Sequence, residues 1–140
     1  MKLSFKILAL FIVFATFGCT QTAKENQEQE DPNKALYNQV MDIHDEVMPR
    51  MDELFKLKKQ LSEKIVNSPD LVESKKRELE NTIYLLDSAS RGMMKWMNDF
   101  SPEEFSEDDL RIYLEAEMKR MQEVKALMLD ALEKGTKANE

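Results

Sequence analysis

The side chains best suited to chemistry in this chain gather around its single histidine. His44 has a methionine three residues before it, Met41, and another four residues after it, Met48, and Met51 continues the series. On a helix these four side chains fall along one side. Thioether sulfur and imidazole nitrogen are soft ligands that suit Cu(I). The spacing raises the hypothesis of a metal-binding or stress-sensing module, to which a neighbouring antiparallel helix could add Met93, Met94 and Met97.

The same methionines also have a simpler explanation, which is packing. Methionine fills irregular gaps in a core and packs well against Trp and Phe. Ile43 and Val47 already occupy the core side of this stretch, and Met51 continues that side. Met41 and Met48 then lie at the edge of the core. The favoured interpretation is therefore core packing or a partner-binding surface, with the metal site as the alternative.

Other chemistry finds less support. Carboxylate pairs occur at 45–46, 52–53 and 103–104, but in an acidic chain such pairs are usually solvated helix surface. A hydrolase would need a deep pocket holding two buried acids. There is no Gly-rich phosphate loop and no nucleophile with a base beside it. We therefore expect a protein that is not an enzyme, and the sequence identifies no small-molecule substrate.

The amino-acid composition narrows the possible classes of fold and function further. The chain of 140 residues carries 27 acidic and 20 basic side chains, for a net charge of −7. Lys2 and Lys6 are the only charges in residues 1–18, so the remainder is more acidic still. Such a surface repels phosphate backbones, which argues against nucleic acid as a partner. Only 3 Gly and 4 Pro among many Glu, Lys, Leu and Met favour long helices.

The N-terminus reads as an export signal that ends in a lipidation site. Lys2 and Lys6 precede an apolar stretch over residues 7–17, which is shorter than the roughly 20 residues of a bilayer span. Gly18 and Cys19 follow directly, as in the bacterial lipobox, in which the cysteine is acylated and the chain is cut before it. Residues 1–18 are thus predicted to be a lipoprotein signal peptide. Thr20, in place of Asp, favours the outer membrane by resemblance to lipoprotein sorting rules.

Two other interpretations of this segment stay open. The chain could be secreted after a cut near Ala15 or Gly18, or the apolar stretch could remain as an uncleaved anchor. The lipobox match is imperfect, because Thr16 stands where Leu is usual and Phe17 is bulky for its position. Cys19 is nevertheless the only cysteine, so it can form no disulfide within the chain. We expect a covalent lipid on Cys19 and no other cofactor.

The elements that would position these groups are three helices behind a tether. Residues 20–33 contain no large apolar side chain and are predicted to form, with Cys19, a disordered tether. Apolar residues then recur at spacings of three and four, which predicts helices over about 34–66, 70–100 and 106–134. Short connections make the helices antiparallel, so the fold class is all-α, an elongated three-helix bundle over residues 34–135. Gly135 is expected to end the last helix, with residues 136–140 frayed.

Three local features refine this prediction. Pro49 lies inside the first apolar stripe, which keeps its phase across it, so a kinked continuous helix is favoured over two separate helices. Val72 is placed at the start of the second stripe, and Glu117 interrupts the third. Ser101 and Ser106 each have an acidic residue three positions later, which is an N-terminal capping pattern.

The stretch HDEVMPRM at residues 44–51, followed by LFKLKKQL, resembles a family of small envelope lipoproteins of the Bacteroidetes, often labelled "viral A-type inclusion protein". The resemblance covers about residues 34–134. It implies an envelope address and a helical fold, and it carries no activity with it. The leading hypothesis is a lipid-anchored envelope protein with a structural or protein-binding role, whose partner is another envelope protein or a second copy of itself.

Overall fold

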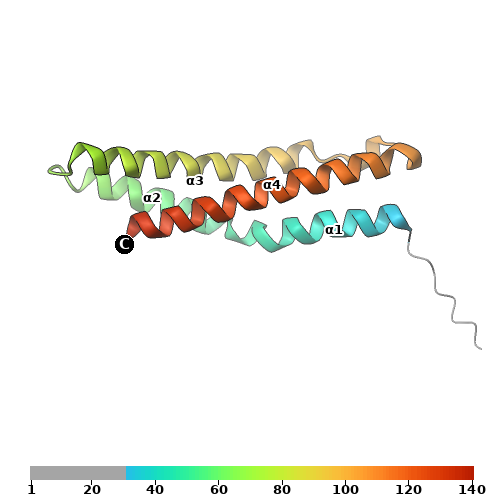
Figure 1. The fold of residues 1–140 in the computed structure, drawn as a ribbon, viewed down its shortest axis with the longest axis horizontal. Helices are drawn as coiled ribbons and strands as arrows, with labels where there is room; N and C mark the ends of the chain where they lie inside the picture. The colour runs from blue at the N-terminus through green and yellow to red at the C-terminus, as the bar shows by residue number, and fades with distance from the viewer. Residues whose placement is uncertain (1–30) are drawn as a thin grey trace, which may run out of the picture.

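The computed structural model describes residues 31–140, and all regular structure in this range is helical (Figure 1). Three rods lie side by side, and the first and last run in the same direction while the middle one runs in the opposite direction. The all-α bundle predicted from the sequence is confirmed. The elements in chain order are α1 (Pro32–Val47), the 3-10 turn η1 (Met48–Arg50), α2 (Met51–Val66), α3 (Glu73–Asp99), the 3-10 turn η2 (Pro102–Glu104) and α4 (Glu107–Asn139).

The first rod consists of α1, η1 and α2, and it bends at Pro49 (Figure 1). Pro49 has no N–H to donate to the preceding turn. The Met48 N–H donates to the His44 carbonyl as the last α-helical bond of α1, and the chain then tightens into a 3-10 turn, in which the Met51 N–H donates to the Met48 carbonyl. The backbone at Met48, Arg50 and Met51 stays right-handed helical. This agrees with the kinked continuous helix that the phase of the stripe favoured.

The helix starts differ from the prediction by a few residues. The side chain of Asp31 accepts a hydrogen bond from the Asn33 N–H at 2.9 Å, so α1 begins at Pro32, inside the stretch assigned to the tether. Residues 1–30, which include the predicted signal peptide, Cys19 and most of the predicted tether, lie outside the described range. At the other corner, the capping pattern at Ser101 produces only η2, and α4 begins directly after Ser106.

The end of the last helix was predicted wrongly. Gly135 does not terminate α4, which continues to Asn139. Gly135 is buried, and a Cβ on it would lie 3.1 Å from methyl carbons of both Leu57 and Leu86. The glycine therefore lets α4 approach α2 and α3 closely. Lys64 secures the final turn by donating to the carbonyls of Ala138 and Asn139, both at 3.2 Å.

The two halves of the bundle pack differently. In the half built from α2, this helix packs against both α3 and α4 around fully buried leucines. In the other half, α1 packs its backbone mainly against α4, and side chains fill the space between α1 and α3. Two of the apolar-stripe assignments are corrected: Val72 is 66% exposed at the start of α3, and Glu117 is 3% exposed, within the core stripe of α4. Within residues 31–140, no helix is both long and apolar enough to cross a membrane.

Candidate functional site

Aromatic rings bridge the space between α1 and α3. The ring centroids of His44 and Trp96 are 5.5 Å apart, and Trp96 stacks on Phe100 at 4.8 Å. Phe100 also meets Tyr37 of α1 at 5.9 Å and Tyr113 of α4 at 6.0 Å. The Tyr113 hydroxyl accepts a hydrogen bond from the backbone N–H of Ser101 at 2.8 Å. The rings thus join all three rods in the half of the bundle where α1 and α3 do not pack closely.

His44 is held in one orientation by its neighbours. Its side chain is only 14% exposed, and its Nδ1 lies 2.8 Å from Oδ1 of Asp45. A carboxylate oxygen can only accept, so Nδ1 carries the hydrogen. In the neutral ring, Nε2 then keeps its lone pair free for another partner. The structure places His44 against Trp96, with its side chain mostly buried.

The structure separates the four residues of the predicted His–Met site. Met51 is 5% exposed and belongs to the core. Met41 and Met48 are half-buried at the edge of that core, on either side of His44 along the helix. Met97 of α3 is half-buried as well, next in sequence to the Trp96 ring that His44 contacts. Within residues 93–97, Trp96 contacts the histidine, Met93 is fully buried in the core and Met94 is 54% exposed, so the convergence of these methionines on His44 stays a prediction.

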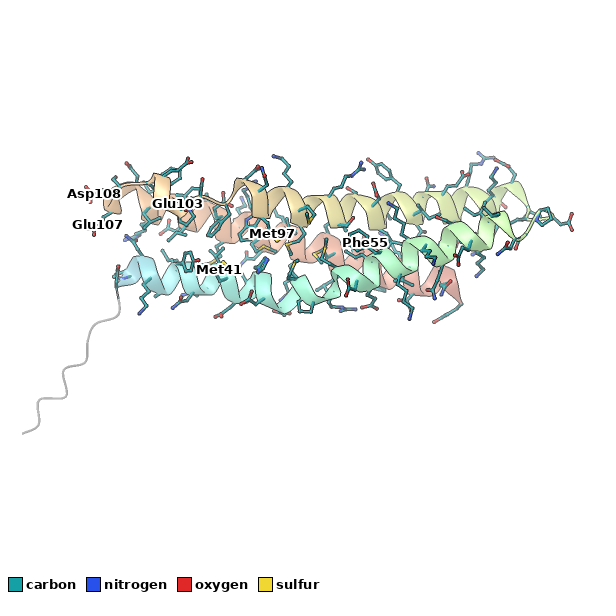
Figure 2. The ribbon with its side chains drawn as sticks, turned by 180° about the vertical axis from the view of Figure 1, so that it is seen from behind. Met41, Phe55, Met97, Glu103, Glu107 and Asp108 are labelled. Carbon is teal, nitrogen blue, oxygen red and sulfur yellow. The ribbon has the colours of Figure 1, made fainter. Side chains whose placement is uncertain are left out.

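Apolar side chains at the surface gather on the side of the bundle opposite α4. In Figure 2, Met41, Phe55 and Met97 lie between the first rod and α3. Tyr37, Phe55 and Met94 are 38%, 49% and 54% exposed, which is high for such large apolar groups. On the first rod the positions are spaced by four, seven and seven residues, which keeps them on one side. We call this surface the methionine–aromatic face; it consists of Tyr37, Met41, Met48, Phe55, Met94 and Met97.

Acidic side chains gather at the end of the bundle where α1 begins. Figure 2 shows Glu103, Glu107 and Asp108 at this end, close to the first turn of α1. The Asn33 side-chain amide donates to the Glu107 carbonyl at 3.1 Å and so ties the start of α1 to the start of α4. Acids in the first turn of a helix interact favourably with its positive end. The predicted tether therefore joins the bundle at its most acidic corner.

The carboxylates do not form a catalytic arrangement in the described range. Asp45, Asp52 and Glu103 are exposed, as the solvated-surface interpretation expected. Among residues 31–140, Glu117 is the only acidic residue that is buried. Its Oε1 accepts a hydrogen bond from Arg120 at 2.7 Å, while its Oε2 has no partner in the structure. The same range contains no group of three or more His, Cys, Asp or Glu placed to hold a metal ion.

Ion pairs shift the pKa values of three surface groups. Hydrogen bonds from Lys95, and more weakly from Asn98 and Arg120, lower the pKa of Asp99 although partial burial opposes them. Burial acts to lower the pKa of Arg120, but the hydrogen bonds and negative charges of Glu117 and Asp99 outweigh it, so that pKa is raised. The hydrogen bond from Lys58 lowers the pKa of Asp87 against the opposing effect of burial, with help from the charge of Arg91. The pairs Lys58–Asp87 and Arg120–Asp99 connect different helices of the bundle.

The hollows on the surface are open. One of about 290 Å³ lies between α3 and α4 and includes Trp96 in its lining. One of about 530 Å³ lies along α4 near the Pro49 bend, and its lining includes Arg50, Glu133 and Glu140. Both of these acids are exposed. Another hollow, of about 330 Å³, is mostly apolar and is lined by Phe105 and by residues of α4. None of these hollows resembles the deep pocket with two buried acids that a hydrolase would need.

Sequence reasoning predicted the edge positions of Met41 and Met48 but missed the ring system and the burial of Glu117. The four-residue spacing of Trp96 and Phe100 could have indicated a stacked pair, since such positions meet on a helix. Glu117 lies in phase with the third apolar stripe, which could have indicated a buried position, but its charge was interpreted as an interruption. Comparison of the chain with models of protein families, with curated proteins and with solved structures finds no match.

Proposed function

We propose that this chain is a lipid-anchored protein of a bacterial cell envelope that works by binding another protein through its methionine–aromatic face. The observation that carries the binding role is the exposure of Tyr37, Phe55 and Met94 on one side of the bundle. Contiguous apolar surface on a soluble domain is characteristic of interaction sites. Aromatic residues and Met are also enriched in protein interfaces. The partner we expect is an apolar helix of another envelope protein, or of a second copy, laid along this face.

The anchor part of the proposal rests on the sequence of residues 1–19. A positive start, an apolar stretch too short to span a bilayer and a terminal Gly18-Cys19 together support export and acylation. The resemblance to small Bacteroidetes lipoproteins supports the same address. The acidic corner beside the start of α1 adds a physical reason for the tether. Anionic lipid headgroups repel that corner, so a spacer between Cys19 and the bundle avoids an unfavourable contact.

Mass spectrometry of the mature protein tests the anchor. We expect a chain that begins at Cys19 and carries acyl groups. An intact Met1, or a mature Cys19 without acyl groups, would contradict the envelope assignment. The Cys19→Ser variant is the matched control, and it should stay in the soluble fraction or keep its signal peptide.

Site-specific photo-crosslinking in intact cells tests the binding role. A photoreactive amino acid at Phe55 or Met94 should give a discrete adduct, whose partner is then identified by mass spectrometry. Tyr84 provides the control, because it is 65% exposed on α3 but outside the methionine–aromatic face. Equal adducts from Tyr84 and Phe55, or none from Phe55 and Met94, would refute a specific interface there. A self-adduct would identify the partner as a second copy.

A further inference from the structure

We infer that His44, Met41, Met48 and Met97 form a binding site for a single Cu(I) ion, with the indole of Trp96 packed against the site. The methionine spacing suggested such a site from the sequence, and the contacts between α1 and α3 specify it. It excludes Met51, which is in the core, keeps Met97 among the methionines expected from the opposite helix, and places Trp96 beside His44. The inference goes beyond the proposed function and does not depend on protein binding.

The nitrogen ligand is prepared by Asp45. The carboxylate takes the Nδ1 hydrogen at 2.8 Å, which leaves Nε2 of the neutral ring as the metal-binding atom. A carboxylate–histidine pair of this kind is a common outer-shell arrangement at metal sites, where it fixes the ring and raises its basicity. Because the His44 side chain is 14% exposed, a metal on Nε2 would be largely shielded from water.

We assign three methionine sulfurs as the remaining ligands. Met41 and Met48 lie three residues before and four residues after His44, so their side chains are on the same side of the helix. Met97 approaches from α3, and Figure 2 shows Met41 and Met97 on the same side of the bundle, between α1 and α3. All three are half-buried at the edge of the core. Unbranched methionine side chains can adjust their sulfur positions through three rotatable bonds.

The ligand set selects a soft ion. Thioether sulfur with imidazole nitrogen favours Cu(I), whereas Zn²⁺, Ca²⁺ and Mg²⁺ require thiolate, several imidazoles or oxygen ligands. No group of three or more His, Cys, Asp or Glu is placed for those ions between residues 31 and 140. The ring of Trp96, 5.5 Å from the His44 ring, adds an electron-rich face beside the cation. Binding Cu(I) to the neutral ring requires no redox step.

The single tryptophan provides a direct readout. The full chain in detergent micelles is titrated anaerobically with Cu(I) against a chromogenic Cu(I) chelator, while the fluorescence of Trp96 is followed. We expect one equivalent to bind and to quench Trp96. His44→Ala, or the near-isosteric Met48→Leu, should weaken binding at least about tenfold, and Asp45→Asn should weaken it by roughly tenfold. Circular dichroism verifies that each variant is folded.

Two controls make the result decisive. Met128→Leu removes a buried core methionine of α4 and should leave Cu(I) affinity unchanged. The thiol of Cys19 binds Cu(I) whenever it is not acylated, so each titration is repeated with Cys19→Ser. No competition with the chelator, or binding that ends with Cys19→Ser, would overturn the inference. Binding that leaves Trp96 fluorescence unchanged and survives both His44→Ala and Met48→Leu would overturn it as well.

Discussion

The buried Glu117 allows a prediction that separates the two members of an ion pair. The side chain of Glu117 is 4% exposed, whereas that of Arg120 is 44% exposed. Only Oε1 of the carboxylate has a partner, at 2.7 Å, and Oε2 has none in the structure. Removing the arginine should therefore destabilise the fold much more than removing the acid, since it leaves a buried charge uncompensated.

The magnitudes follow from the exposure of each partner. Breaking a fully buried pair costs about 3–5 kcal/mol, and the partial exposure of the guanidinium reduces this to about 2 kcal/mol for Arg120→Met. Glu117→Met removes the desolvated carboxylate and keeps a side chain of similar length, so it should be neutral or stabilising by about 1 kcal/mol. The double variant should then return close to the stability of the unmodified chain.

Urea unfolding followed by circular dichroism measures this cycle. With a slope of about 2 kcal/mol per molar urea, Arg120→Met should lower the midpoint by about 1 M. Arg111→Met is the control, because its pair with Glu115 is exposed on both sides and should contribute less than about 0.5 kcal/mol. The reasoning is refuted if Arg120→Met costs no more than Arg111→Met, or if Glu117→Met costs as much as Arg120→Met.

Four further predictions concern the packing and acid stability of the bundle. A Cβ on Gly92 would meet one leucine methyl at 3.8 Å, so Gly92→Ala should stabilise the chain by about 0.5–1 kcal/mol in urea unfolding. Gly135→Val should instead destabilise it by about 2 kcal/mol, and an unchanged midpoint would mean that α4 does not approach its neighbours there. Deleting residues 136–140 removes a buried alanine and two lysine hydrogen bonds, for an expected loss of about 1–2 kcal/mol, whereas a frayed tail would be lost without effect. Because the pKa of Asp87 is lowered in the folded chain, its carboxylate stabilises the fold at pH values above the unfolded pKa of about 3.9, and this contribution disappears as the pH falls through the lower folded pKa. The Asp87→Asn variant should therefore lose less stability than the unmodified chain between about pH 5 and pH 2.

The overall fold was predictable because the dominant signal is local. Apolar residues spaced by threes and fours define the helices, and the phase of the stripe across Pro49 indicates a bend within one rod. The edge positions of Met41 and Met48 followed from the same spacing. Each of these inferences needs only neighbours within two turns of one helix.

The errors have other causes, and that at Gly135 depends on contacts with two other helices. Gly135 has the composition of a helix end, but here it allows α4 to pack against leucines of α2 and α3. Glu117 was interpreted as an interruption of the stripe, but Arg120, one turn later on α4, allows it to be buried. Val72 fits the stripe by spacing and is exposed because α3 begins only after it. Intrinsic preference and periodicity carry no information on such contacts.

The division of the bundle into two unlike halves bears on where function resides. Around α2 the core is made of leucines, and the helices approach closely enough to require Gly135. Around α1, rings and thioethers replace close backbone packing, and this half contains both of the buried side-chain atoms without partners in the described range, Nε1 of Trp96 and Oε2 of Glu117. A core selected only for stability would exclude such atoms, because each costs free energy without a partner. Local rules in a folded protein are broken mainly where function requires it. The half around α1 is therefore where the Cu(I) site and most of the partner-binding face are proposed, with Phe55 extending that face onto α2. The leucine core of the half around α2 holds the helices together.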